Sequence, residues 1–346
     1  MPAPGPCRNC AKWPLGISRP AFETTWIDRQ KEHSVTEKRR HPIGGNWASL
    51  LLPINPDDSI NFDKLGEEID ILIAARVDGI YSNGTAGEFH NQTEAEFDRI
   101  QSMLAKRCTK AGMPFVIGAC QPDAMIQLDR VRRAASFRPL AIQVILPDWW
   151  PLNDLEAADF LARASKVADG IALILYNPPH AKRVLTPREL ANICIPCPDI
   201  VGIKLSDGGA DWYGEARKHL QEFSLFVPGH HLATGMREGV AAGAFSNVAC
   251  LSPRGAQRWT DLIETNLEAA LETERRICRF MDEHIVPFRQ KAGYSNAALD
   301  KLLSAIGNWG PVGTRLRWPY RAIDETEAAR LSEIAREALG ELFFAP

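Results

Sequence analysis

Lys204 has a residue type and a sequence environment that could support chemistry. It ends the otherwise apolar run of residues 200–203. Lysine is among the side chains least often buried, and burial would disfavour its ammonium form and leave a nucleophilic amine at neutral pH. Lys204 is therefore a candidate nucleophile, although a lysine can also extend to a rim or pair with a carboxylate.

Tyr176 is a second candidate, because Asn177, Pro178 and Pro179 follow it. The two prolines force the chain away after the tyrosine and leave its hydroxyl at the end of the preceding run. A functional hydroxyl at the rim is one interpretation. A core tyrosine with a satisfied hydroxyl is the other.

A third segment, residues 83–88, reads Asn-Gly-Thr-Ala-Gly-Glu. Its two glycines allow a tight turn whose backbone N–H groups can point at an anion. The segment could equally be an ordinary turn in which Glu88 serves the next helix.

The elements that must position these residues alternate from residue 44 onward, with short apolar runs followed by longer amphipathic stretches. This alternation predicts repeated βα units around a parallel sheet. Three helix starts carry a capping side chain three residues before a glutamate, at Thr93, Asn153 and Thr186. The eight expected strands are residues 47–52, 79–82, 115–119, 141–146, 171–176, 201–204, 224–227 and 244–248.

These units predict an α/β fold, a (β/α)₈ TIM barrel with a C-terminal helical extension. No glycine-rich dinucleotide fingerprint follows the first strand, which argues against an open doubly wound sheet. We expect an extended or disordered N-terminal arm at 1–42, the barrel at 43–266 and a helical region at 267–346. Catalytic groups of such barrels lie at the C-terminal ends of the strands, where all three segments fall.

The bulk composition favours a small-molecule partner. The 346 residues include 40 basic and 43 acidic side chains, so no net field attracts nucleic acid or an anionic membrane. No run approaches the roughly 20 apolar residues of a membrane span, and no apolar secretion signal is evident, so we expect a cytoplasmic protein. The cysteines are not spaced like those of a disulfide framework, so we expect reduced thiols. Two CxxC pairs, 7–10 and 194–197, have the spacing of half a zinc site, but they are too far apart in the chain to favour a shared metal.

In order and spacing the segments resemble the dihydrodipicolinate synthase and N-acetylneuraminate lyase family of class I pyruvate-type aldolases. The resemblance runs from about residue 42 to residue 320. It includes the turn at 84–88, the tyrosine motif at 176–179, the lysine motif at 202–204, the late barrel segment 239–247 and the segment 313–315.

The resemblance implies that Lys204 attacks the ketone of pyruvate or a related 2-oxo acid to form an imine. Tyr176, helped by Thr85, would carry protons, and an aldehyde would be the second substrate. No metal or organic cofactor is expected. The residues expected to contact substrate are Thr85, Ala86, Trp150, His230 and Phe245.

Departures from the family pattern favour an enzyme other than a true dihydrodipicolinate synthase. Ala86 lacks the hydroxyl expected in the turn, Trp149 and Trp150 replace a tyrosine pair, and Ala181 replaces an arginine that Lys182 or Arg183 would have to supply. The tryptophans, together with His230 and His231, suggest a bulkier or less polar aldehyde, although the two histidines could also be ordinary surface imidazoles.

Two other functions remain open. A dehydratase or hydratase-aldolase would use the same imine, and a non-catalytic barrel would only bind a 2-oxo acid. The resemblance also implies a homo-oligomer, a dimer or tetramer, and the adjacent Trp149 and Trp150 lie where the dimer contact would form.

Overall fold

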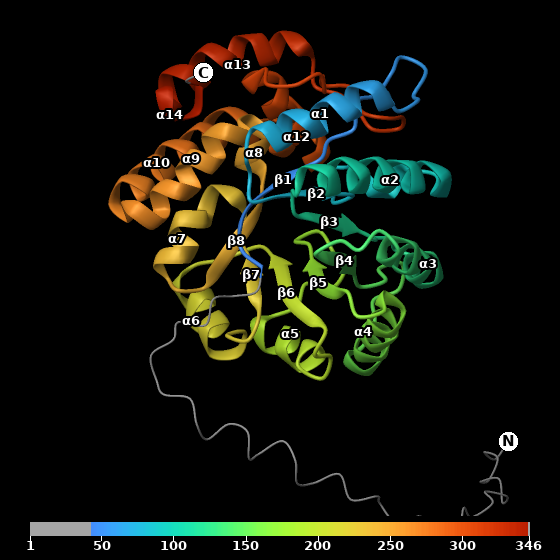
Figure 1. Cartoon of the computed structure of the whole chain (residues 1–346). Helices are drawn as coiled ribbons and strands as arrows, with labels where there is room; N and C mark the ends of the chain where they lie inside the picture. The colour runs from blue at the N-terminus through green and yellow to red at the C-terminus, as the bar shows by residue number, and fades with distance from the viewer. Residues whose placement is uncertain (1–42, 345–346) are drawn as a thin grey trace, which may run out of the picture. The chain divides into compact units, whose positions relative to one another are not determined.

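The computed structural model describes residues 43–344, so the predicted arm 1–42 and the cysteine pair 7–10 lie outside the described part of the chain. Eight parallel strands close into a barrel in chain order, with β8 paired to β1 (Figure 1). Helices lie between the strands and further helices follow the last one, so the predicted (β/α)₈ barrel is confirmed. The strands are β1 Gly45–Ser49, β2 Gly79–Ser82, β3 Phe115–Gly118, β4 Ala141–Ile145, β5 Ala172–Asn177, β6 Ile200–Leu205, β7 Ser224–Phe226 and β8 Ala241–Ser246.

The helices between and after the strands vary in length from single turns to five turns. Those of the barrel layer are α1 Phe62–Ala74, α2 Glu94–Ala111, α3 Ala124–Ala135, α4 Asp154–Ala168, α5 Pro187–Cys194, α6 Ala210–His219, α7 Leu232–Arg237 and α8 Asn247–Leu251. The later ones are α9 Pro253–Thr265, α10 Leu267–Phe280, α11 Val286–Ala292, α12 Asn296–Gly307, α13 Glu325–Leu339 and α14 Glu341–Phe344. Short 3₁₀ turns η1 Phe89–Asn91 and η2 Gly229–His231 and a π-helical turn η3 Met281–Ile285 complete the set.

Local sequence signals position the helix starts as predicted. Thr93, Asn153 and Thr186 each accept a hydrogen bond from the glutamate N–H three residues on, and each glutamate bonds back to the backbone of the capping residue. These capping boxes satisfy backbone donors that would otherwise lack partners at the first turn. They fix where α2, α4 and α5 begin, and with them the lengths of the loops above the barrel.

The bounds of two strands were predicted wrongly. β1 runs from Gly45 to Ser49 rather than from residue 47 to 52, and β8 begins at Ala241 rather than at residue 244 and ends at Ser246 rather than at residue 248. The first half of β8 is made of small residues, which do not look like a strand in isolation. At Gly243 an added Cβ would lie 2.4 Å from the carbonyl oxygen of Gly45, so the close approach of β1 requires a residue without a side chain. Ser246 then caps α8, which contains Val248.

Two apolar cores hold the barrel. One fills its interior, where Trp47, Tyr81, Ile174, Phe226 and Phe245 pack together. The other lies between the strands and the helical layer and continues into the C-terminal helices. In Figure 1 these helices, coloured orange to red, gather beside α8 and α1, and α12 packs on both α8 and α13.

The helical extension reaches the mouth of the barrel through an irregular segment. The turn η3 joins α10 to α11, and a proline stands in the first turn of α11. Proline lacks the N–H that a continuous α-helix needs there, and such π-helical turns occur often at functional sites.

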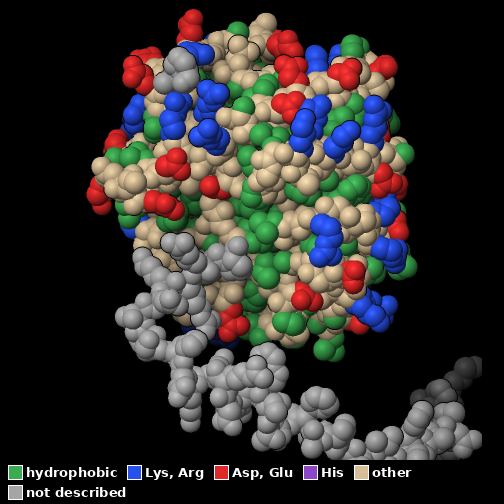
Figure 2. Space-filling model, in the orientation of Figure 1, with side chains coloured by type: hydrophobic (Ala, Val, Ile, Leu, Met, Phe, Trp, Pro, Cys, Tyr) green, Lys and Arg blue, Asp and Glu red, His purple; other side chains and the backbone are tan. Residues whose placement is uncertain are grey.

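The molecular surface has mixed charge where it can be seen. Figure 2 shows Lys and Arg side chains interspersed with Asp and Glu around a central band of hydrophobic and neutral groups. This face therefore presents no broad field of one sign that would attract a polyanion. Within residues 43–344, no helix combines the length and the apolar character needed to cross a membrane.

Candidate active site

Lys204 and Tyr176 are direct neighbours on adjacent strands. In the β5–β6 register Tyr176 is paired with Lys204, so both side chains point the same way at the C-terminal end of the barrel. The Lys204 Nζ lies 4.3 Å from the centroid of the Tyr176 ring. It is also 4.9 Å from the Tyr81 ring and 5.2 Å from the Phe245 ring. The amine therefore lies among three aromatic rings.

This environment favours the neutral amine. Burial lowers the pKa of Lys204 to about 8, and the charges of Cys120, Asp300 and Cys250 only partly oppose that shift. Aromatic faces attract an ammonium group, but the loss of water outweighs that attraction here. With this pKa, roughly a tenth of the amine is neutral and therefore nucleophilic at pH 7, far more than for an exposed lysine.

Tyr81 is a functional candidate that the sequence analysis missed. Lys204 Nζ donates to its hydroxyl at 3.4 Å, and the Gln143 amide donates to the same oxygen at 3.3 Å. Burial raises the pKa of Tyr81 well above its ordinary value. An added Cβ on Gly84 would lie 1.2 Å from the Tyr81 hydroxyl oxygen, so that glycine is needed to admit the ring.

Tyr176 faces the turn of residues 83–88. Burial raises the pKa of the Tyr176 hydroxyl to about 12, and the nearby Thr85 side chain limits the rise. Oγ1 of Thr85 is itself buried, without a partner of good hydrogen-bond geometry in residues 43–344. The N–H groups of Thr85 and Ala86 also donate to no acceptor within this range. Unsatisfied buried polar groups are rare, so the Thr85 hydroxyl together with these two N–H groups favours a bound anion.

Glu88 does not serve the next helix, because its partner is 213 residues away. Its Oε1 accepts from Lys301 Nζ at 2.6 Å, and both side chains are fully buried. Lys301 also donates to the carbonyl oxygen of Arg315 at 2.6 Å. Asn83 and Glu88 both have a left-handed backbone, with φ of 54° and 49°. The ion pair thus anchors a strained turn to helix α12.

A cavity of about 600 Å³ opens above these groups at the C-terminal end of the barrel. Its lining includes most of the predicted site residues, namely Thr85, Ala86, Tyr176, Lys204, His230 and Phe245. Trp150 is not among them, and its side chain is 81% exposed in the single chain. Its predicted contact with substrate is thus not made within one chain.

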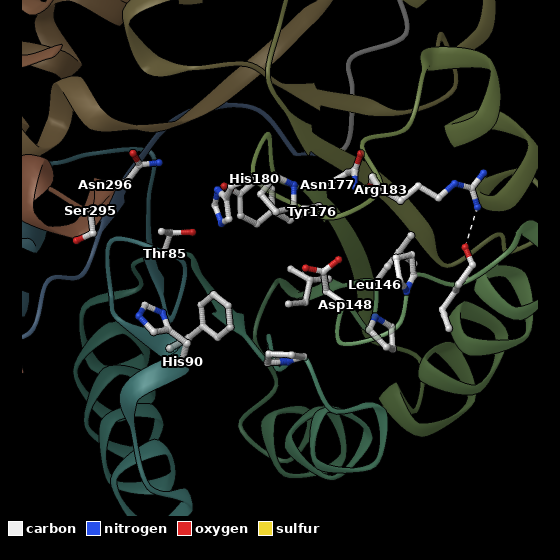
Figure 3. Close-up of a pocket in the computed structure, with 18 of the residues that line it drawn as sticks. Thr85, His90, Leu146, Asp148, Tyr176, Asn177, His180, Arg183, Ser295 and Asn296 are labelled. Carbon is white, nitrogen blue, oxygen red and sulfur yellow. Dashed lines mark hydrogen bonds between the residues drawn. The ribbon is translucent and has the colours of Figure 1, made fainter. Parts of the chain in front are cut away.

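A second cavity of about 410 Å³ adjoins the first and shares Thr85, Tyr176, Arg289 and Asn296 with it. Figure 3 shows Thr85, Tyr176, His180 and Asp148 around this opening. Much of the remaining lining is apolar, from Phe89, Ile145, Leu146, Pro147, Pro151 and Leu152. The two cavities together form a polar end beside Lys204 and a less polar end beyond Tyr176.

The two histidines after β7 have different environments. His230 lines the Lys204 cavity, and burial lowers its pKa to about 4, so it is neutral at neutral pH. His231 lies outside it and pairs with Asp207 at 2.9 Å, which raises the pKa of His231 to about 10. Only His230 is therefore placed to contact a substrate.

The loop after Tyr176 uses its basic residues structurally. Lys182 Nζ donates to the carbonyl oxygen of Trp149 at 2.6 Å and lies over the Trp149 ring. Arg183 lines the second cavity, but its guanidinium pairs with Asp154 and Glu189. Neither residue therefore offers a free cation in place of the arginine that Ala181 replaces. Arg289 on α11, in contrast, lines both cavities.

Helix α12 brings a second missed residue, Asp300, into the Lys204 cavity. A signal for it existed, because residues 296–307 contain only two charged side chains, Asp300 and Lys301. A helix that is apolar on most sides is buried, and a charged residue in it needs a partner or a function.

Comparisons with known proteins identify the family of this chain. The Dihydrodipicolinate synthetase family model matches residues 42–338. An N-acetylneuraminate lyase of Rhizobium meliloti is 23% identical over 304 residues, 86% of this chain and 96% of the relative. A Methylobacterium radiotolerans protein named "Probable 5-dehydro-4-deoxyglucarate dehydratase" is 26% identical over 288 residues, 80% and 90% of the two chains.

Among solved structures, the prophage protein YagE of E. coli K12, in complex with pyruvate, shares the fold with a TM-score of 0.74 at 18% identity. The match covers 86% of this chain and 98% of YagE. The family model spans nearly all of the described residues, from the first strand into α13. The chain therefore belongs to the dihydrodipicolinate synthetase family, which contains lyases and dehydratases.

Proposed function

We propose that this protein is a class I aldolase or lyase in which Lys204 forms an imine with pyruvate or a related 2-oxo acid. The observation that carries the proposal is the Lys204 amine, which shares one cavity with Tyr176 and the unpartnered donors of the Thr85–Ala86 turn. The imine withdraws electrons from the neighbouring C–C bond. The turn would hold the carboxylate, and Tyr176 with Thr85 would carry protons.

The second substrate would lie toward the less polar cavity. Its lining of proline, leucine and phenylalanine side chains suits an aldehyde of moderate size and low polarity better than a highly hydroxylated sugar acid. Trp149 and Trp150 stand where a tyrosine pair would be needed for a true dihydrodipicolinate synthase, so we propose a different aldehyde. The exposed tryptophans also support assembly into a dimer or tetramer.

Loss of water from a 2-oxo acid is a second candidate, because the same imine supports it. The 26% identical relative named as a dehydratase and the carboxyl group of Asp300 in the cavity favour this candidate. Product analysis by mass spectrometry separates the two, since cleavage gives two smaller products and dehydration gives one product lighter by a water.

The protein is expected to form a covalent adduct when it is incubated with pyruvate and a borohydride reagent. Reduction fixes the imine, and peptide mapping should place the added mass on Lys204. Because only the neutral amine attacks, and burial lowers the pKa of Lys204 to about 8, the trapping rate should rise as the pH rises toward about 8. Absence of an adduct with pyruvate and with bulkier 2-oxo acids would favour the non-catalytic barrel.

Replacing Tyr176 with phenylalanine should keep the ring over Lys204 and remove only the hydroxyl. We expect the imine adduct to persist, while exchange of the pyruvate methyl protons in deuterated water slows by about 10²–10⁴-fold. Proton NMR follows that exchange without knowledge of the aldehyde. An exchange rate equal to that of the unmodified protein would remove Tyr176 from the proton relay.

A further inference from the structure

The cavity that holds Lys204 also contains a carboxyl group, that of Asp300 on α12. Among the described residues that line this cavity, Asp300 is the sole acidic side chain. Its carboxylate accepts no hydrogen bond and forms no ion pair with residues 43–344. The adjacent Lys301 points elsewhere, to Glu88. Asp300 therefore faces the cavity without a structural partner.

Asp300 is partly exposed, and its carboxyl group loses hydration in the cavity without gaining a partner, so packing alone does not explain it. Tyr176 and Thr85 can relay a proton between hydroxyls, but the loss of water from a carbinolamine also needs a group that gives its own proton up. Ala86 has no hydroxyl, and the Tyr176 phenol holds its proton until about pH 12. A group that exchanges a proton near neutral pH is found on α12 instead.

Asp300 and Lys204 form an electrostatic pair with closely matched proton affinities. Burial raises the pKa of Asp300 to about 7, and Lys204 opposes that rise. Burial lowers the pKa of Lys204 to about 8, and Asp300 opposes that fall. Because the two pKa values lie about one unit apart, a neutral amine beside a protonated carboxyl group is a minor protonation state of the pair near neutral pH, in exchange with the ion pair. Other titratable groups that act on Asp300 or line the same cavity are Tyr81, Tyr176, His230, Cys250 and Arg289.

We propose that Asp300 is a further catalytic residue, the acid that expels water from the carbinolamine and the base that then forms the enamine. This proposal rests on the imine at Lys204 argued above. Lys204 Nζ bonds to the ketone carbon, and the Tyr176 hydroxyl relays a proton from nitrogen to the former carbonyl oxygen. The Asp300 carboxyl proton joins that hydroxyl, the C–O bond breaks and water leaves. The iminium then faces the Asp300 carboxylate.

The same carboxylate next removes a proton from the carbon beside the iminium carbon. The C–H electron pair becomes the C=C bond of the enamine, the C=N π pair returns to nitrogen, and Asp300 is protonated again. No oxidant, reductant or further reactant is required. An Asp300→Asn variant keeps the shape of the side chain and removes this proton transfer.

We expect Asp300→Asn to slow both reductive trapping of the pyruvate imine and exchange of the pyruvate methyl protons by about 10²–10⁴-fold. In the unmodified protein the exchange rate should rise as Lys204 becomes neutral and fall again as the pair loses its last proton. Asp300→Asn should lose the alkaline fall, and its acid limb should move to lower pH because a negative charge near Lys204 is gone. Asp300→Glu should retain the bell shape.

Asp282→Asn is the matched control, because it removes an exposed carboxylate near His230 that does not line the cavity. Its rates should equal those of the unmodified protein. Trapping at Lys204 with unchanged rates and an unchanged pH profile in Asp300→Asn would overturn the role of Asp300 alone, whereas no trapping in the unmodified protein would overturn the imine itself. A missing alkaline limb in the unmodified protein would also count against Asp300, whatever the stability of the variants.

Discussion

Replacement of Lys204 with methionine is expected to abolish the reductively trapped pyruvate adduct and to slow pyruvate methyl exchange by at least about 10³-fold. Methionine fills the same space between the three aromatic rings but has no amine to attack a ketone. In the proposed mechanism the large effect follows from the covalent step, because Tyr176 and the Thr85 turn would act only on an intermediate that Lys204 has formed. Intact-mass spectrometry and proton NMR measure the two outcomes.

Lys182→Met is the matched control for this substitution. Lys182 is exposed, and its amine is bound to the carbonyl oxygen of Trp149 near the same end of the barrel. The Lys182→Met variant should leave adduct formation and methyl exchange unchanged. Lys204→Met should also raise the midpoint of thermal unfolding, because it removes a buried amine that is costly to desolvate. An adduct that survives in Lys204→Met would show that another amine is the nucleophile.

The barrel could be predicted because its determinants are local. Most strands are short apolar runs, and each capping box lies within four residues of chain, so both are readable without knowledge of tertiary contacts. The start of β8 was missed for the opposite reason. Ala241 and Gly243 form a strand because β1 and β7 lie close on both sides, and small residues have little strand preference of their own.

The candidate site could likewise be predicted only in part. Lys204, Tyr176 and Thr85 could be predicted to lie close together, because strand ends converge in any parallel barrel, whatever the details of packing. Tyr81 was missed because its strand is apolar, and sequence alone does not tell which of its alternating side chains faces the barrel interior. Asp300 could not be placed, because its position depends on how α12 docks over the barrel.

A buried ion pair gives the largest expected effect on stability. Lys301→Met should lower the free energy of unfolding by about 3–5 kcal/mol, because it leaves the Glu88 carboxylate buried without its cation. The turn that Glu88 anchors carries Thr85 and Ala86, so the concentration of pyruvate needed for half-maximal trapping should rise as well. Urea unfolding and the trapping assay measure these two quantities.

The double variant Lys301→Met/Glu88→Gln separates the charge from the packing. If the loss in Lys301→Met comes from an uncompensated carboxylate, removal of that charge should recover much of it, and the double variant should lose less stability than the sum of the single variants. Lys218→Met serves as the control, because the exposed Lys218 lies 4.0 Å from Glu215. Loss of this exposed ion pair should lower the free energy of unfolding by less than about 1 kcal/mol. Additive losses would show that Lys301 stabilises the fold through its hydrogen bond to Arg315 and not through Glu88.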